Sequence, residues 1–163
     1  MAATDPARWQ LAQLNIARLV APYDAPELAD FVANLARIYG LAEASEGFVW
    51  RMAHEDRDAV AAHYGADIVT NLSVWESLAA LQRFVVSADH LAMMRRRREW
   101  FVPLTEANLV LWWVPAGHRP DLDEAALRLA SLRRDGPTAF AFHPRQAFAP
   151  PMRLAGGSRV AVQ

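Results

Sequence analysis

The stretch from Phe84 to Pro115 constrains the fold most, because it joins a helical run, a turn at Pro103 and a strand within one short segment. On a helical wheel at about 100° per residue, one face of the helical run carries five residues: His90, Met93, Met94, Arg97 and Phe101. A histidine and an arginine on an apolar face are costly unless they meet partners or a ligand. The sequence therefore predicts a site beside this helix.

Length, composition and net charge limit the number of domains and the class of partner. A chain of 163 residues with 53% hydrophobic content is long and apolar enough for one domain. We expect a single domain over residues 8–145, with flexible tails at 1–7 and 155–163. The net charge of −1 creates no overall field for nucleic acid or membranes. A helix would splay the four arginines of 95–98 around its circumference, so this run indicates a solvated face rather than a nucleic-acid site.

The residues that are missing exclude several classes of protein. There is no cysteine, hence no disulfide, no thiol nucleophile and no cysteine-based metal site. No apolar run approaches the roughly 20 residues that span a bilayer, and the beginning of the chain has no apolar segment typical of a signal peptide. We therefore expect a cytoplasmic protein that does not enter the membrane.

Hydrophobic periodicity predicts the order of the elements. The first strand has two different faces, with Ala12, Leu14 and Ile16 on one and the more polar set Leu11, Gln13 and Asn15 on the other. The predicted elements are a strand over 9–19, a helix over 26–44, a strand over 48–54, a connection over 54–66 with at most a helical turn, a strand over 68–75, two helical runs between 77 and 101, a strand over 108–114, a helix over 121–135 and a last extended segment around Phe140, Phe142 and Phe148.

This order is a βαββαβ arrangement, which defines the fold class as α+β. It predicts a ferredoxin-like antiparallel sheet of four strands with helices on one face. The other face would be bare and would carry large residues among polar ones. An exposed apolar patch of that size is commonly covered by a second copy related by two-fold symmetry. The pattern therefore predicts a homodimer.

Five sequence runs resemble one known family. They are LAQLNIARL near the start, GFVWR at 47–51, NLSVWESLAAL at 71–81, HLAMMRRRREWF at 90–101 and LVLWWVPAGHRP at 109–120. Together they resemble the DUF3291 family over roughly Gln10 to Phe142. The resemblance implies the dimeric α/β-barrel superfamily, whose relatives include cofactor-free antibiotic-biosynthesis monooxygenases, muconolactone-isomerase-like proteins and heme-binding members. It implies the fold and the dimer, and it leaves the reaction open because DUF3291 is a family of unknown function.

His90 and Arg97 are the candidate catalytic residues, because they stand two helical turns apart on one side. His90 could transfer a proton, and Arg97 could hold an anionic oxygen or a carboxylate. In the alternative interpretation, His90 bonds a backbone carbonyl and Arg97 pairs with a buried carboxylate such as Glu76.

A second group of candidates would bind the substrate. Asn15, Asn71 and Ser73 come from strands that are neighbours in this fold and could form a polar patch. A few polar groups within mostly apolar walls are typical of small-molecule pockets. The surrounding apolar residues would be Trp50, Trp75, Met94 and Trp113. Equally, this face could pack on a partner subunit, since interfaces are also rich in aromatic residues.

Local motifs for other chemistries are missing from the sequence. It contains no HExxH and no carboxylate–histidine cluster, so we expect no metal site. It also contains no GxSxG, Walker loop or GxGxxG, which argues against serine hydrolases, NTPases and dinucleotide enzymes. Heme needs only one axial histidine, and His90 would be the first choice. Tyr23, Tyr39 and Tyr64 are possible proton donors, and their spacing selects none.

These observations lead to a hypothesis for function. We expect a small homodimeric enzyme that acts on an apolar or aromatic small molecule by oxidation, isomerisation or cyclisation, without a tightly bound cofactor, in secondary metabolism. One alternative is a non-catalytic dimer that binds a small ligand or heme. The other is a structural accessory subunit.

Overall fold

The computed structural model describes residues 9–53 and 56–152, so the predicted tails at 1–7 and 155–163 lie outside the described residues. Five strands form one antiparallel sheet in the order β2-β3-β1-β4, and β5 also pairs with β1. The strands are β1 (Trp9–Leu19), β2 (Phe48–Arg51), β3 (Ile68–Trp75), β4 (Phe101–Val102) and β5 (Leu109–Pro115). With β4 as a short addition, this is the predicted ferredoxin-like sheet, and the α+β fold class is confirmed.

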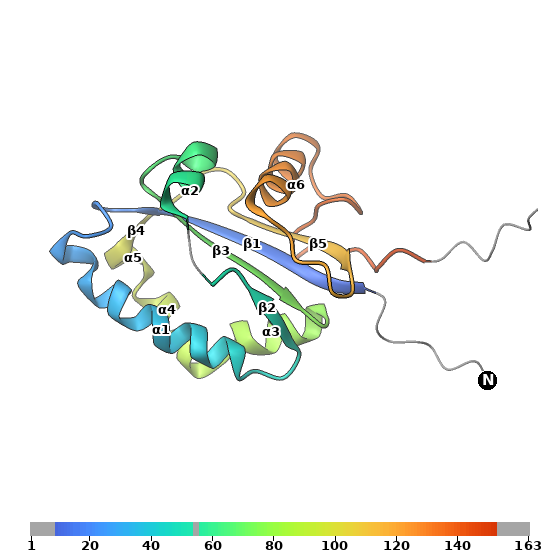
Figure 1. Cartoon of the computed structure of the whole chain (residues 1–163), viewed down its shortest axis with the longest axis horizontal. Coiled ribbons are helices and arrows are strands. Elements are labelled where there is room, and N and C mark those ends of the chain that lie inside the picture. The colour runs from blue at the N-terminus through green and yellow to red at the C-terminus, as the bar shows by residue number, and fades with distance from the viewer. Residues whose placement is uncertain (1–8, 54–55, 153–163) are drawn as a thin grey trace, which may run out of the picture.

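The helices lie on both sides of the sheet (Figure 1). One side carries α2 (Arg57–Tyr64) and α6 (Leu122–Asp135). The other side carries η1 (Pro26–Leu28), α1 (Ala29–Glu43), α3 (Leu78–Val85), α4 (Ala88–Arg95) and α5 (Arg97–Trp100).

The face under α2 and α6 is a closely packed core. Ala12, Leu14 and Ile16 of β1 point into it, as predicted, and none is more than 3% exposed. Helix α6 contributes four apolar residues at helical spacing, which are Leu122, Ala125, Leu129 and Leu132. The sheet contributes Leu72, Val74, Val110, Trp112 and Val114 to the same core. Strand β5 is thus buried on both faces, because Leu111 packs on the opposite side.

The expectation that helices cover one face only is wrong. Helix α6 was predicted, but no side of the sheet was assigned to it, and α2 was expected to be a connection. Asp56 caps α2 by accepting from the backbone N–H groups of Asp58 and Ala59, and Val60 is fully buried in the core. Since the described residues leave neither sheet face bare, the argument that a bare face requires a homodimer is lost, and the homodimer itself stays a prediction.

Other boundaries differ locally. Helix 26–44 begins as the short 3-10 turn η1, and the strand expected over 48–54 ends at Arg51. The helical run through His90 breaks at two points: Ser87 caps α4, and Arg96 separates α4 from α5. Phe101, expected on the helix, pairs with Leu19 in β4 instead. The last extended segment is limited to two isolated bridges, which join Phe142 to Leu111 and His143 to Gln146.

Candidate functional site

A cavity lies between the polar face of the sheet and the helices α1, α3 and α4. It has two compartments, with volumes of about 150 Å³ and about 240 Å³. Both are lined by the same central residues, which are Asn15, Tyr39, Asn71, His90 and Met94. Because an apolar cavity of about 150 Å³ can hold benzene, the space suits a small aromatic molecule.

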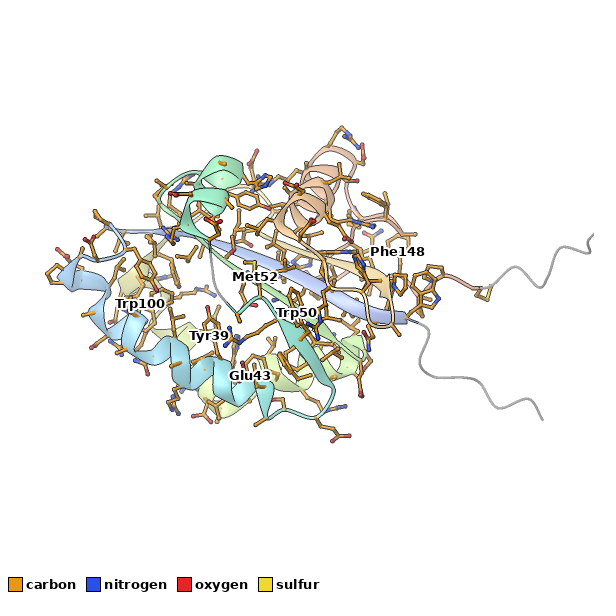
Figure 2. All side chains as sticks on the ribbon, viewed as in Figure 1. Tyr39, Glu43, Trp50, Met52, Trp100 and Phe148 are labelled. Atoms are coloured by element: carbon orange, nitrogen blue, oxygen red, sulfur yellow. The ribbon has the colours of Figure 1, made fainter. Side chains whose placement is uncertain are left out.

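The walls of the cavity are mostly apolar. The first compartment is bounded by Phe31, Leu35, Ile38, Met93 and Trp100. Phe31, Leu35 and Ile38 come from α1, Met93 comes from α4 and Trp100 comes from α5. Of α1 and α4, only Phe31 and Ala42 are buried, because much of the apolar surface borders the cavity instead of a packed core. Figure 2 marks Tyr39 on α1 and Trp100 at the end of α5.

A hydrogen-bonded network forms the floor of the second compartment. Antiparallel pairing places Gln13 opposite Ser73 and Asn15 opposite Asn71. Gln13 Nε2 lies 2.8 Å from Asn71 Oδ1, 3.3 Å from the Asn71 backbone oxygen and 3.0 Å from Ser73 Oγ. The Trp75 indole N–H donates to the same Ser73 Oγ at 3.0 Å. Gln13 and Ser73 are 7% and 4% exposed, so the network is built into the interior.

Chemistry fixes the polarity of this network. A backbone carbonyl only accepts, so the Gln13 atom near the Asn71 carbonyl is a nitrogen, and the Asn71 atom facing it is an oxygen. The Asn71 Nδ2 group then points away from Gln13 with two protons to donate. Ser73 Oγ already accepts two hydrogen bonds, so its own proton must be donated elsewhere. The floor therefore offers donors, which suit an oxygen that accepts hydrogen bonds.

His90 lines both compartments and has one engaged nitrogen. Its Nδ1 atom lies 2.8 Å from the backbone oxygen of Val85, and its ring packs against Phe84 at 5.2 Å between centroids. Since the carbonyl can only accept, Nδ1 carries a proton and Nε2 keeps its lone pair in the neutral ring. Burial lowers the pKa of His90 below its usual 6.5, and the bond to Val85 opposes this in part. His90 is therefore neutral at pH 7, with Nε2 available as a base.

Arg97 lies at the edge of the cavity and is exposed. The alternative interpretation holds in part, because His90 does bond a backbone carbonyl, that of Val85. The Arg97 side chain, in contrast, has no hydrogen bond or ion pair with Glu76 or with any other residue of 9–53 and 56–152. The helical wheel predicted Arg97 on the inward face of one continuous helix. Because the helix breaks at Arg96, Arg97 lies at the edge of the cavity instead of in its interior. A free guanidinium at this edge can meet an anionic group of a ligand.

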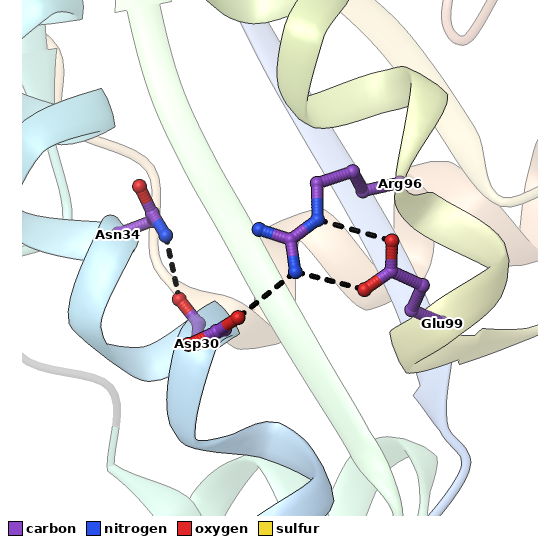
Figure 3. A network of polar contacts seen from close by, with 4 residues as sticks. All are labelled: Asp30, Asn34, Arg96 and Glu99. Carbon is purple, nitrogen blue, oxygen red and sulfur yellow. Dashed lines mark hydrogen bonds and ion pairs between the residues drawn. The ribbon is translucent and has the colours of Figure 1, made fainter.

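Two ion-pair contacts join α1 to α4 across the cavity. Arg96 donates to Asp30 of α1 at 2.9 Å and to Glu99 at 2.8 and 3.0 Å (Figure 3). The hydrogen bonds from Arg96 to Glu99 lower the pKa of the Glu99 carboxyl group. Arg37 of α1 pairs with Asp89 of α4. Helix α4 has no buried residue, so these surface contacts add to the packing of Met93 and of the His90 ring in holding it over the cavity.

The structure brings together seven of the nine predicted site residues: Asn15, Asn71, Ser73, Trp75, His90, Met94 and Arg97 line the cavity. It does not bring Trp50 and Trp113 there. Trp50 stands opposite Val74 and packs on the core under α6. Trp113 is on the correct face but lies further along β1, opposite Leu11, and its indole N–H donates to the Phe148 carbonyl.

Sequence reasoning missed Gln13 and Tyr39. Gln13 was placed on the polar face of the first strand, and its position two residues from Asn15 is the signal that could have selected it. Tyr39 borders both compartments, and Arg51 stacks over its ring at 4.1 Å. In the sequence it is one of three possible proton donors that the spacing does not distinguish. Of the other tyrosines, Tyr23 lines the first compartment, and Tyr64 lies on the opposite side of the sheet.

Two structural features are absent from the described residues. In the described part of the chain, no three histidine or acidic side chains cluster in a way that could bind a metal. Over the same residues, no helix has the length and apolar character needed to cross a bilayer.

The fold and the cavity define a class: a ferredoxin-like α+β domain with a cavity between its sheet and one helical layer. Within this class, residues 10–156 match the Domain of unknown function (DUF3291). The chain belongs to the DUF3291 family, which confirms the predicted resemblance.

Several solved structures are distantly similar to this chain. PA3566 from Pseudomonas aeruginosa is 16% identical with a TM-score of 0.46, over 67% of this chain and 95% of that one. A conserved protein from Methanosarcina mazei Go1 is 15% identical with a TM-score of 0.47, over 64% and 93%. SnoaB, a cofactor-independent oxygenase from Streptomyces nogalater, is 18% identical with a TM-score of 0.43, over 69% and 96%. Among curated proteins, none matches the sequence. Function therefore has to be argued from this chain's own residues.

Proposed function

We propose that this protein is a small enzyme that transfers a proton within an apolar or aromatic substrate, without a tightly bound cofactor. One observation carries the proposal: His90 is held by the Val85 carbonyl through Nδ1, which leaves Nε2 as a base on the wall of a mostly apolar cavity. Its lowered pKa keeps the base form populated at neutral pH.

The proposed step begins with a substrate C–H or O–H group that is acidic because of a neighbouring carbonyl or aromatic ring. His90 Nε2 takes the proton and becomes an imidazolium, while the electron pair moves onto the substrate oxygen. Hydrogen-bond donors on Asn71 and Ser73 would stabilise that oxygen, and Arg97 would add positive charge at the edge. Asn15 would orient the substrate. Returning the proton to another carbon gives isomerisation, and the same anion can cyclise or react with dioxygen.

The proposal keeps the predicted setting, a cytoplasmic homodimer of secondary metabolism. The alternatives are a non-catalytic dimer that binds a small ligand or heme, and a structural accessory subunit. Sedimentation equilibrium tests the dimer directly, because a single mass of one subunit across the concentration range contradicts it. Hemin titration tests heme binding, because axial ligation through His90 would give a Soret shift that His90→Asn abolishes.

Hydrogen–deuterium exchange tests the proton transfer itself. The probe is 2-tetralone, an enolisable bicyclic ketone, followed by NMR in deuterated buffer. We expect the protein to accelerate exchange at the carbons next to the carbonyl. Exchange should rise with pH through the pKa of His90, which lies below 6.5, and level off near neutrality.

The matched variant is His90→Asn, whose amide N–H can still donate to Val85 but which has no basic nitrogen. We expect it to lose about 10²- to 10⁴-fold of the catalysed exchange, the usual contribution of general-base catalysis. If 2-tetralone binds and exchanges no faster than in buffer, the protein is a binding protein. If the two proteins exchange equally fast, His90 is not the base.

A further inference from the structure

A shallow groove of about 380 Å³ adjoins the cavity on the outer side of α4 and α5. It is lined by Leu91, Met94, Arg95, Arg97 and Arg98. Met94 and Arg97 also line the first compartment of the cavity, so the two hollows meet at these side chains. A ligand that entered the cavity past Met94 would therefore lie beside this groove.

The groove concentrates positive charge that the protein does not compensate. Among the described residues, Arg95, Arg97 and Arg98 have neither an ion pair nor a hydrogen bond from their guanidinium groups. The remaining arginine of the run, Arg96, differs from these three because its side chain bonds Asp30 and Glu99. The sequence predicted only a solvated helix face here. That prediction does not explain why three arginines without partners among the described residues line one groove in a chain whose net charge is −1.

Three guanidinium groups around an apolar floor match a specific ligand chemistry. Arginine presents a planar fork of donors that suits phosphate oxygens, and a phosphate carries enough charge to engage more than one fork. Leu91 and Met94 can meanwhile pack against the carbon chain that leads from the phosphate.

We propose that the natural ligand carries a phosphate group, which the groove binds while the apolar part occupies the cavity. The inference rests on the proposed function, because the same cavity takes the reacting part of the molecule. Two sources share this chemistry: a phosphate ester of the apolar compound itself, and a carrier thioester whose phosphates lie at the end of a longer linker.

Calorimetric titration with matched probes separates the two parts of the ligand. The probes are 2-naphthol, 2-naphthyl phosphate, inorganic phosphate and the coenzyme A thioester of 2-naphthoic acid. At low salt we expect 2-naphthyl phosphate or the thioester to bind about tenfold more tightly than 2-naphthol, and this gain to shrink as salt screens the charges. The tighter of the two identifies the source.

Arg95→Gln and Arg98→Gln test the groove without changing the proposed catalytic residues. Each should weaken the phosphate-bearing probe by about three- to fivefold, as for an exposed ion pair, and leave 2-naphthol binding unchanged. Arg119→Gln, which removes the same charge from the loop before α6, is the control and should bind all probes like the wild type.

The outcomes distinguish the two proposals. If 2-naphthol binds and phosphate adds nothing, or if Arg119→Gln weakens the phosphate probe as much as Arg95→Gln, the groove inference is overturned and the cavity stands. If inorganic phosphate binds as tightly as 2-naphthyl phosphate while 2-naphthol does not bind, the groove is an anion site unconnected to the cavity, which contradicts both proposals. If no probe binds, both fail.

Discussion

The two faces of the same sheet are used in opposite ways. Under α2 and α6, apolar side chains from three strands and two helices are buried almost completely. Under α1, α3 and α4, the same strands present Gln13, Asn15, Asn71 and Ser73 to a cavity, and α4 has no buried residue at all. The second face also has two smaller buried clusters, around Trp75 and Trp100, so it combines packing with an open cavity.

The difference follows from single-residue alternation along β1. Leu14 points into the packed core, while its neighbours Gln13 and Asn15 point to the cavity. Because a shift of one residue would exchange the two faces, the sequence pattern specifies the register strongly. Stability and the proposed function are thus divided between alternate residues of the same strands, and mutations can separate them.

The largest effect should come from one substitution made on each face. Leu129→Ala removes a 1%-exposed side chain from the core under α6 and should lower the free energy of unfolding by about 2–5 kcal/mol. Leu35→Ala, on the cavity wall, should lower it by about 1 kcal/mol or less, because that side chain is only half-buried. Urea denaturation compares the two. Equal losses would show that the cavity face is as tightly packed as the core.

Removing the amide that orders the cavity floor should have the next largest effect. Gln13→Met keeps the length of the side chain but removes the amide that donates to Asn71 and Ser73, of which Ser73 still accepts from the Trp75 indole N–H. We expect a loss of about 1–3 kcal/mol in the free energy of unfolding, the usual result of leaving buried polar groups unpaired. Gln10→Met on the same strand is the control, because Gln10 accepts only from the Gly117 N–H at an exposed position. An equal loss in both variants would show that the hydrogen bonds of Gln13 contribute no more to stability than the exposed one of Gln10.

A smaller effect of opposite sign is expected on the packed face. The Tyr64 hydroxyl is buried without a hydrogen-bond partner among the described residues, and burial raises the pKa of Tyr64 from 10.0 to about 12. Tyr64→Phe removes this unsatisfied group and should leave stability unchanged or raise it by up to about 1 kcal/mol. A clear loss of stability would indicate a hidden partner.

The pH dependence gives Tyr64→Phe a second readout. A pKa raised by folding contributes stability that is full below pH 10 and is lost as pH rises toward about 12. The wild type should therefore lose more stability than the variant over this interval. Parallel curves would mean that Tyr64 titrates alike in the folded and unfolded states.

The smallest effect should come from the contacts that hold α4 over the cavity. Asp30→Asn removes the ion pair with Arg96 and should speed probe entry by a factor of about two, since exposed pairs contribute little. The difference from the wild type should disappear at high salt. Stopped-flow fluorescence with 2-naphthol measures the rate. Entry that is unchanged at low salt would show that α4 does not limit access.

Much of the architecture was predictable because it depends on periodicity. The strands at 9–19 and 68–75 and the inward residues of α6 follow from spacing alone. The segment around Val60 was not recognised as a helix, because its few apolar residues are overridden by charged neighbours, and burial against α6 stabilises it. Most residues of the candidate site were also predictable. The helical wheel put His90 on the inward side of its helix, strand alternation put Asn71 on the polar face of the sheet, and both line one cavity. The sequence could not show that Trp50 and Trp75 lie on opposite faces of the sheet, because a bulge between Phe48 and Trp50 shifts the register of β2.

The sequence by itself determined which residues alternate on β1 and β3 and which polar residues cannot lie easily in an apolar setting. These are local properties, encoded by side-chain type and spacing. Only the tertiary structure decided that α2 and α6 cover the second face, that α4 stands away from the sheet, and that Arg95, Arg97 and Arg98 border one groove while Arg96 turns to Asp30. Those outcomes depend on contacts between segments far apart in the chain, which no local pattern records.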